Sequence, residues 1–163
     1  MPVVDFAALP ADARVWVFAA DASLTESGTR ALIHAVDEFL SKWNAHGHPL
    51  RSARALRDNR FLAIGVDQST AGASGCSIDG LFRALQLAEN AIGARLLPGG
   101  RVYWRTTAGD IRSAERGDFS RRAKGGEISD ATPVFDTTVT TAAEWRDAFE
   151  RPARETWHAT LLR

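Results

Sequence analysis

Cys76 is the only cysteine of the chain, and it lies in residues 73–80, where a strand is predicted to end and a helix to begin. A thiol at the start of a helix faces unpaired backbone N–H groups and the positive end of the helix dipole, which favour the thiolate. The same N–H groups can hold an anion. The segment therefore predicts nucleophilic chemistry or anion binding, and no complete catalytic motif decides between them.

Cys76, His46 and Asp67 supply the residue types of a nucleophile, a base and a carboxylate that orients the base. They are the candidate catalytic residues. The candidate ligand-binding residues surround them in the predicted fold and are Trp43, His48, Ser74, Gly75, Cys76, Ser77 and Asp79.

Structural roles are the alternative for each candidate. Cys76 could be a small buried hydrophobic residue packed under the loop. His46 and Asp79 fit the two ends of helices, where the dipole favours them. Ser77 fits the N-cap of the second helix, and Ser74 fits a tight entry into it. The sequence therefore predicts where these residues lie more firmly than it predicts a chemical activity for them.

Metal binding is the main rival chemistry, because His46, His48 and Cys76 would offer imidazole and thiolate ligands suited to zinc. A closed structural site needs a fourth ligand, such as Asp67 or the distant His158. This ligand set is incomplete, so we expect no metal and no cofactor.

The elements that must position these residues begin with an apolar run at residues 15–20, which predicts a buried strand. Ser23 and Glu26 form a capping-box pattern that opens a helix, and Gly47 is placed to stop it. Apolar side chains recur along this helix at helical spacing: Leu32, Val36, Phe39, Leu40 and Trp43.

A predicted hairpin follows, with strands at residues 52–56 and 60–67 joined by a turn. A second helix then runs to the Pro-Gly-Gly sequence at 98–100, and residues 102–104 resume strand character. One face of that helix carries apolar side chains at Ile78, Leu81, Leu85, Ala88 and Ile92.

The order strand, helix, strand, strand, helix, strand predicts an α+β fold of the ferredoxin-like split βαβ type, an antiparallel sheet with both helices on one face. In that topology, the end of the first helix, the end of the third strand and the start of the second helix share one end of the sheet. We therefore expect His46, Asp67 and Cys76 to lie close together.

A C-terminal extension of strands and helices completes a single predicted domain over residues 1–163, with the core at about 14–107 and the extension at about 108–163. Strands are predicted at 111–114 and 133–139, and a short helix at 119–124. A second capping box, Thr141 with Glu144, opens a last helix that Pro152 ends.

Charge and composition limit the partners. Lys and Arg total 20, equal to Asp and Glu, so no global field recruits nucleic acid or an anionic membrane. The basic residues at 112–124 are interrupted by acidic ones and predict a solvated face. One cysteine makes no internal disulfide, and the N-terminus lacks the pattern of a signal peptide. These features predict a soluble cytoplasmic protein, with no membrane segment.

The chain resembles a family of small bacterial proteins that have sometimes been labelled "ABC transporter ATPase". The resemblance rests on segments spread over most of the chain: Trp43-x-x-His46-Gly47, Arg60-Phe61, Val66-Asp67, residues 73–79, residues 132–136 and Thr156-Trp157-His158. It implies that His46, Asp67 and residues 74–79 belong to one pattern. ATPase activity is not expected, because no Walker lysine follows a glycine-rich loop.

Two functions from different classes remain open. The first is a ligand-binding or partner-binding module, in which the helix start at residues 74–79 holds a small anion and the exposed face of the sheet forms a homodimer. The second is a small thiol-dependent hydrolase or transferase with Cys76 as nucleophile and His46 as acid or base. The binding module is preferred, because it needs only the loop and the helix start, whereas catalysis also needs specific distances between side chains.

Overall fold

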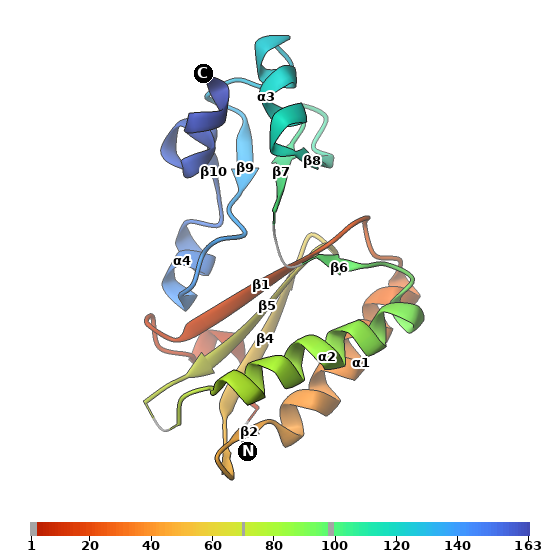
Figure 1. Ribbon diagram of the computed structural model, residues 1–163, viewed down its shortest axis with the longest axis vertical. Helices are drawn as coiled ribbons and strands as arrows, with labels where there is room; N and C mark the ends of the chain where they lie inside the picture. The colour runs from red at the N-terminus through yellow and green to blue at the C-terminus, as the bar shows by residue number, and fades with distance from the viewer. Residues whose placement is uncertain (1–2, 70, 98–99) are drawn as a thin grey trace.

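The computed structural model describes residues 3–69, 71–97 and 100–163. In this part of the chain, two four-stranded antiparallel sheets and one short hairpin combine with several helices (Figure 1). The predicted α+β class is confirmed.

The first sheet has the strand order β4-β5-β1-β6, and α1 and α2 pack against one of its faces (Figure 1). Its elements are β1 (Arg14–Ala20), α1 (Glu26–Lys42), β4 (Arg51–Arg57), β5 (Phe61–Asp67), α2 (Gly75–Ile92) and β6 (Leu96–Leu97). The two predicted apolar helix faces point into this core, which buries Leu32, Val36, Leu40, Leu81, Leu85, Ala88 and Ile92. Gly28 allows the helices to approach closely, because a Cβ there would lie 2.6 Å from the Ile92 carbonyl oxygen.

Both ends of α1 differ from the prediction. Thr25, not Ser23, is the N-cap, and its hydroxyl accepts a hydrogen bond from the Gly28 N–H at 3.0 Å. At the other end the helix stops at Lys42 rather than at Gly47. Trp43 follows in an extended conformation, with φ −72° and ψ 128°, and its side chain is buried in the core.

A small hairpin replaces the predicted last turn of that helix. β2 (Asn44–Ala45) pairs with β3 (His48–Pro49), and the two residues between them, His46 and Gly47, have φ values of 51° and 79°. Positive φ at both central residues is the requirement of a tight hairpin turn. His46 is therefore a hairpin residue and not the helix C-terminal residue considered as its structural role.

The ends of α2 also need correction. Ser74 is the N-cap, and Ser77 is its partner in a reciprocal capping box rather than the cap itself. Gly93, at φ 76°, ends the helix well before the Pro-Gly-Gly sequence, of which Pro98 and Gly99 lie outside the described residues. The fourth strand of the first sheet is Leu96–Leu97, whereas residues 102–104 belong to the second sheet.

The second sheet has the order β10-β9-β7-β8. Its strands are β7 (Arg101–Arg105), β8 (Ile111–Glu115), β9 (Pro133–Phe135) and β10 (Glu150–Pro152), and the helices after them are α3 (Arg116–Lys124), α4 (Ala142–Asp147), η2 (Ala153–Glu155) and η3 (Trp157–Leu162). Thr141 is confirmed as the N-cap of α4, and its hydroxyl accepts from the Glu144 N–H at 3.2 Å. The Glu144 carboxylate accepts from the Thr141 hydroxyl at 3.0 Å and not from the Thr141 N–H, so only half of the predicted capping box forms. β9 is shorter than predicted, and β10 was not predicted.

The second face of the first sheet is covered by the chain itself. η1 (Phe6–Ala8), α4 and side chains of the second sheet pack against it. Phe61 stands at the centre, with its ring centroid 5.3 Å from that of Tyr103, 4.8 Å from Phe135 and 5.1 Å from Phe149. The sheet face expected to mediate a homodimer is therefore covered within the chain, and the homodimer itself stays a prediction.

Arg60 connects the two sheets. Its guanidinium donates to the carbonyl oxygens of Ala20 at 3.1 Å, Ile111 at 3.0 Å and Asp21 at 3.2 Å. The side chain is buried, and this burial lowers its pKa. These bonds and the shared aromatic core place the two sheets in one packed structure.

Candidate functional site

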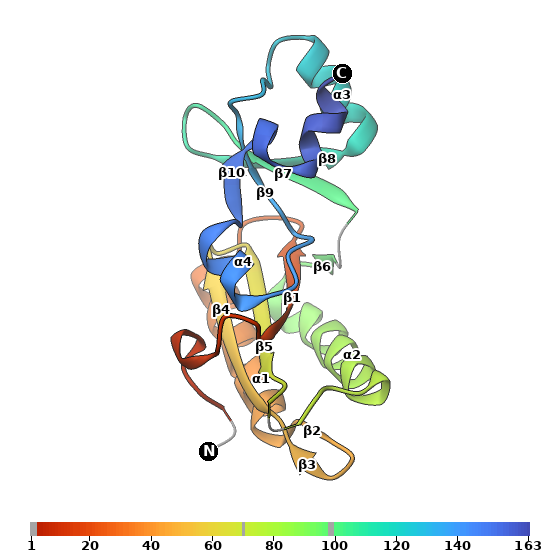
Figure 2. The same cartoon turned by 90° about the vertical axis from the view of Figure 1, so that its left-hand side faces the viewer.

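The predicted site residues do lie at one end of the first sheet. Trp43, just after α1, donates its indole N–H to the Ser77 carbonyl oxygen at 2.8 Å, which ties the end of α1 to the start of α2. The β2–β3 hairpin with His46 and His48 lies at this same end of the molecule (Figure 2). The topology thus gathers the candidates at one end, as the sequence predicts.

Asp67 closes β5 at this end, but its carboxylate is already engaged. Ser69 donates its hydroxyl at 2.6 Å and its backbone N–H at 3.0 Å, and Arg51 donates a guanidinium N–H at 2.8 Å. The Ser69 hydroxyl, helped by the Ser69 N–H and Arg51, lowers the pKa of Asp67. Asp67 stabilises the loop and the β4 register. Within the described residues it makes no bond to a histidine.

His46, His48 and Cys76 are all exposed, and no hydrogen bond joins the thiol to an imidazole in the described part of the chain. The exposure of Cys76 contradicts the alternative of a buried hydrophobic residue. The arrangement brings a nucleophile, an imidazole and a carboxylate to one end of the sheet without assembling them into the hydrogen-bonded series that nucleophilic catalysis uses.

The start of α2 leaves two backbone donors open. The Ser74 hydroxyl accepts from the Ser77 N–H at 3.2 Å, and the Ser77 hydroxyl accepts from the Ser74 N–H at 2.7 Å. The Ile78 N–H bonds to the Ser74 carbonyl oxygen. Among residues 3–69, 71–97 and 100–163, the N–H groups of Gly75 and Cys76 have no partner. The capping box thus fixes the loop while two donors face solvent.

Metal binding finds no support. The described residues contain no group of three or more His, Cys, Asp and Glu side chains arranged to hold a metal ion. His158, considered above as a fourth ligand, lies in η3 beside the second sheet and is 1% exposed. The spacing of His46 and His48 suggested ligands, but His46 lies in the turn of the β2–β3 hairpin, His48 begins β3, and both are exposed.

A second polar cluster forms where residues 132–136 and 156–158 meet. The Trp157 indole N–H donates to Asp136 at 3.3 Å, and the Trp157 ring stacks on His158 with centroids 4.0 Å apart. Burial, with a smaller effect of the nearby Arg116, lowers the pKa of His158 to about 4, although the Asp136 charge opposes this. His158 is therefore neutral at physiological pH, and it packs as part of the core.

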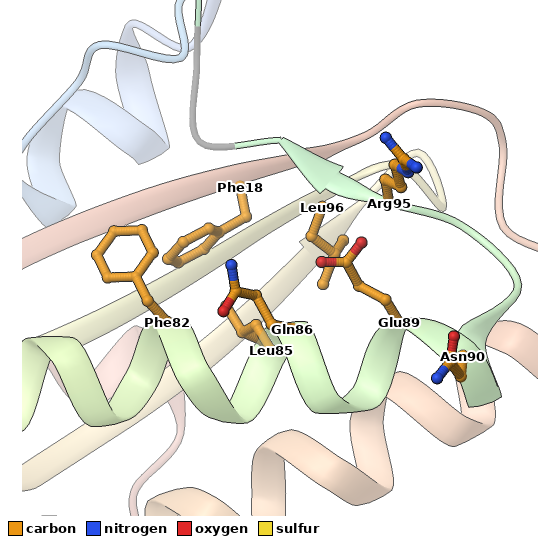
Figure 3. Close-up of a pocket in the computed structure, with 8 residues that line it drawn as sticks. All are labelled: Phe18, Phe82, Leu85, Gln86, Glu89, Asn90, Arg95 and Leu96. Carbon is orange, nitrogen blue, oxygen red and sulfur yellow. The ribbon is translucent and has the colours of Figure 1, made fainter.

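A cleft of about 530 Å³ between α2 and the β1–β6 edge was not predicted from the sequence (Figure 3). Phe18 and Phe82 form part of its floor, and Glu89 and Arg95 lie at its rim. The sequence signal was present in the polar residues 86, 89 and 90, which recur on α2 next to its buried face.

No family model, no curated protein and no solved structure matches this sequence. Among the described helices, none has the length and apolar character needed to cross a membrane. The function must therefore be argued from the geometry of the chain itself.

Proposed function

We propose that the protein is a small ligand-binding module that holds a small anion at the start of α2, in residues 74–79. The observation that carries this proposal is the pair of open N–H donors at Gly75 and Cys76, on the first turn of an 18-residue helix. Backbone donors and the helix dipole together favour negative charge at this position. The loop is already fixed by its capping box, so little ordering opposes binding.

The surroundings agree with an anion more than with a cation. Asp67, the nearby buried carboxylate, is paired with Arg51 and with Ser69, and Asp79 lies one turn into α2 with its side chain exposed. His46 and His48 are exposed imidazoles at the same end of the sheet.

A thiol-dependent hydrolase or transferase is the second candidate, and the exposure of Cys76 is the observation that favours it. That function needs a base within hydrogen-bond reach of the sulfur. Binding needs only the amides and the dipole, so it is the function that we prefer.

We also infer that the first sheet and its two helices form the ferredoxin-like split βαβ arrangement. The order β4-β5-β1-β6, the antiparallel pairing and the common face of α1 and α2 support this assignment. The resemblance to the small bacterial family remains an inference from the motifs and supplies no activity.

Gly75 offers a matched pair of variants that tests the anion site. Gly75→Pro removes one N–H donor and suits the first position of a helix, whereas Gly75→Ala keeps the donor. A Cβ at Gly75 meets nothing within 4 Å, so the alanine side chain does not crowd the fold. We expect Gly75→Ala to bind inorganic phosphate like the wild type, and Gly75→Pro to bind about tenfold more weakly, because one hydrogen bond to a charged group is lost.

Isothermal titration with phosphate, with the thermal midpoint of each variant as the folding control, measures this difference. Equal phosphate affinity of the Pro and Ala variants would remove the start of α2 as the binding site.

A further inference from the structure

The cleft beside α2 is built like a binding site for an amphipathic small molecule. Its volume of about 530 Å³ falls within the roughly 300–1,000 Å³ of small-ligand sites. The floor is apolar, with Phe18 and Phe82 in an edge-to-face contact at 5.3 Å and with Leu85 and Leu96 beside them. The polar groups come from Gln86, Glu89 and Asn90 on α2 and from Arg95 just before β6, and Figure 3 shows the Gln86 amide beside Leu85 and the two rings.

Two opposite charges at the rim lack partners. Glu89 is half-buried, and within the described residues its carboxylate makes no ion pair or hydrogen bond. Arg95 is exposed, and its guanidinium likewise has no partner there. The two side chains are not within ion-pair distance of each other. Figure 3 shows the Glu89 carboxylate rising from α2 toward the strand that follows Arg95.

Further negative charge lies beside the rim, where the Asp21 carboxylate accepts a hydrogen bond from the Arg95 backbone N–H at 3.0 Å. A smaller cavity of about 320 Å³ shares Glu89 and Arg95 and extends to Asp21. The carbonyl end of α2, which stops at Ile92, adds the negative end of the helix dipole. An ammonium group would be favoured here, while Arg95 would favour a carboxylate.

We propose that this cleft binds a free amino acid with an apolar side chain. Its ammonium group bonds to Glu89, its carboxylate bonds to Arg95, and its side chain packs on Phe82, the half-buried ring of the floor. A molecule with only one of the two charges would leave the opposite rim group unsatisfied. The site is distinct from the start of α2, because Glu89 follows Gly75 by 14 helical residues, a rise of about 21 Å.

Titration with L-phenylalanine and with L-leucine tests the proposal in the wild-type protein. Phenethylamine lacks the carboxylate, and 3-phenylpropionate lacks the ammonium group. We expect saturable binding of both amino acids at millimolar concentration or below, and about tenfold weaker binding of each analogue, because each loses one charged contact.

Variants then assign each contact. Glu89→Gln should weaken the binding of phenylalanine and of phenethylamine about tenfold and leave the binding of 3-phenylpropionate unchanged. Arg95→Gln should weaken the binding of phenylalanine and of 3-phenylpropionate and leave the binding of phenethylamine unchanged. Arg83→Gln changes an exposed charge on α2 outside the cleft and serves as the matched control. Gly75→Pro should not alter binding of either amino acid, which separates this site from the anion site.

Absence of saturable binding for both amino acids would overturn the proposal. So would equal losses for all three ligands in both variants, since such a pattern would indicate damage to the fold and not removal of a specific contact.

Discussion

The Phe61→Ala variant is expected to lose about 4 kcal/mol of its free energy of unfolding, the cost typical of removing a fully buried phenylalanine. Phe61 is 0% exposed and lies between the rings of Tyr103, Phe135 and Phe149. Tyr103 and Phe135 lie in strands of the second sheet, and Phe149 lies directly before its strand β10, so the cavity would open at the junction of the two sheets. The loss of stability should therefore lower the unfolding transition of the whole chain and not that of the first sheet alone.

Chemical denaturation followed by far-UV and near-UV circular dichroism measures this effect. We expect one transition that coincides in both signals, shifted by Phe61→Ala to lower denaturant concentration. Leu87→Ala is the matched control, because Leu87 is 82% exposed and its removal should change stability by less than about 0.5 kcal/mol. Two separate transitions, only one of them shifted, would show that the two sheets unfold independently.

Acidification is expected to destabilise the protein by about 3 kcal/mol between pH 6.5 and pH 4 through His158 alone. Burial lowers the pKa of this imidazole from 6.5 to about 4, so in this range the unfolded chain binds a proton that the folded chain does not. Stability therefore falls as the pH falls, by 1.36 kcal/mol per unit at most. Asp67 and Asp118 have lowered pKa values, so their contributions start to fall as the pH approaches 3.8 and are lost mainly below it, under this window.

The free energy of unfolding at several pH values, compared between wild type and His158→Leu, isolates this effect. The variant removes the titrating group and keeps an apolar side chain in the same cavity, so its stability should depend less steeply on pH whatever its absolute value. His34→Gln removes an exposed imidazole and should leave the wild-type slope intact. An unchanged slope in His158→Leu would mean that His158 is not held neutral by burial.

Helical periodicity predicted the first sheet's helices well, because the apolar spacing of α1 and α2 is a local property. The hairpin at Asp58 and Asn59 was also predictable, and both residues have positive φ as such turns require. The order of the strands along the chain was enough to bring Cys76, His46 and Asp67 to one end of the sheet.

Other features depend on contacts that the sequence does not display. A glycine after a histidine suits a helix stop and a hairpin turn equally, and in the structure His46 and Gly47 form the hairpin turn next to the buried Trp43. The apolar pattern of residues 102–104 predicts a strand but does not indicate which sheet the strand joins. β6 has only two residues, too few to show a strand pattern. The cleft was missed because Phe18 and Phe82 both fit an ordinary apolar core.

Phosphate affinity of the wild type, Cys76→Ser and Cys76→Asp, followed through backbone amide chemical shifts, tests the anion-binding proposal most directly. We predict that phosphate shifts the amides of Gly75 and Cys76 most strongly in the wild type. Cys76→Ser should retain this affinity, because it keeps a small polar group beside the same donors. Cys76→Asp should lose it, because a fixed negative charge takes the place of the anion. Shifts confined to other residues, or equal affinity in all three proteins, would contradict an anion site at the start of α2.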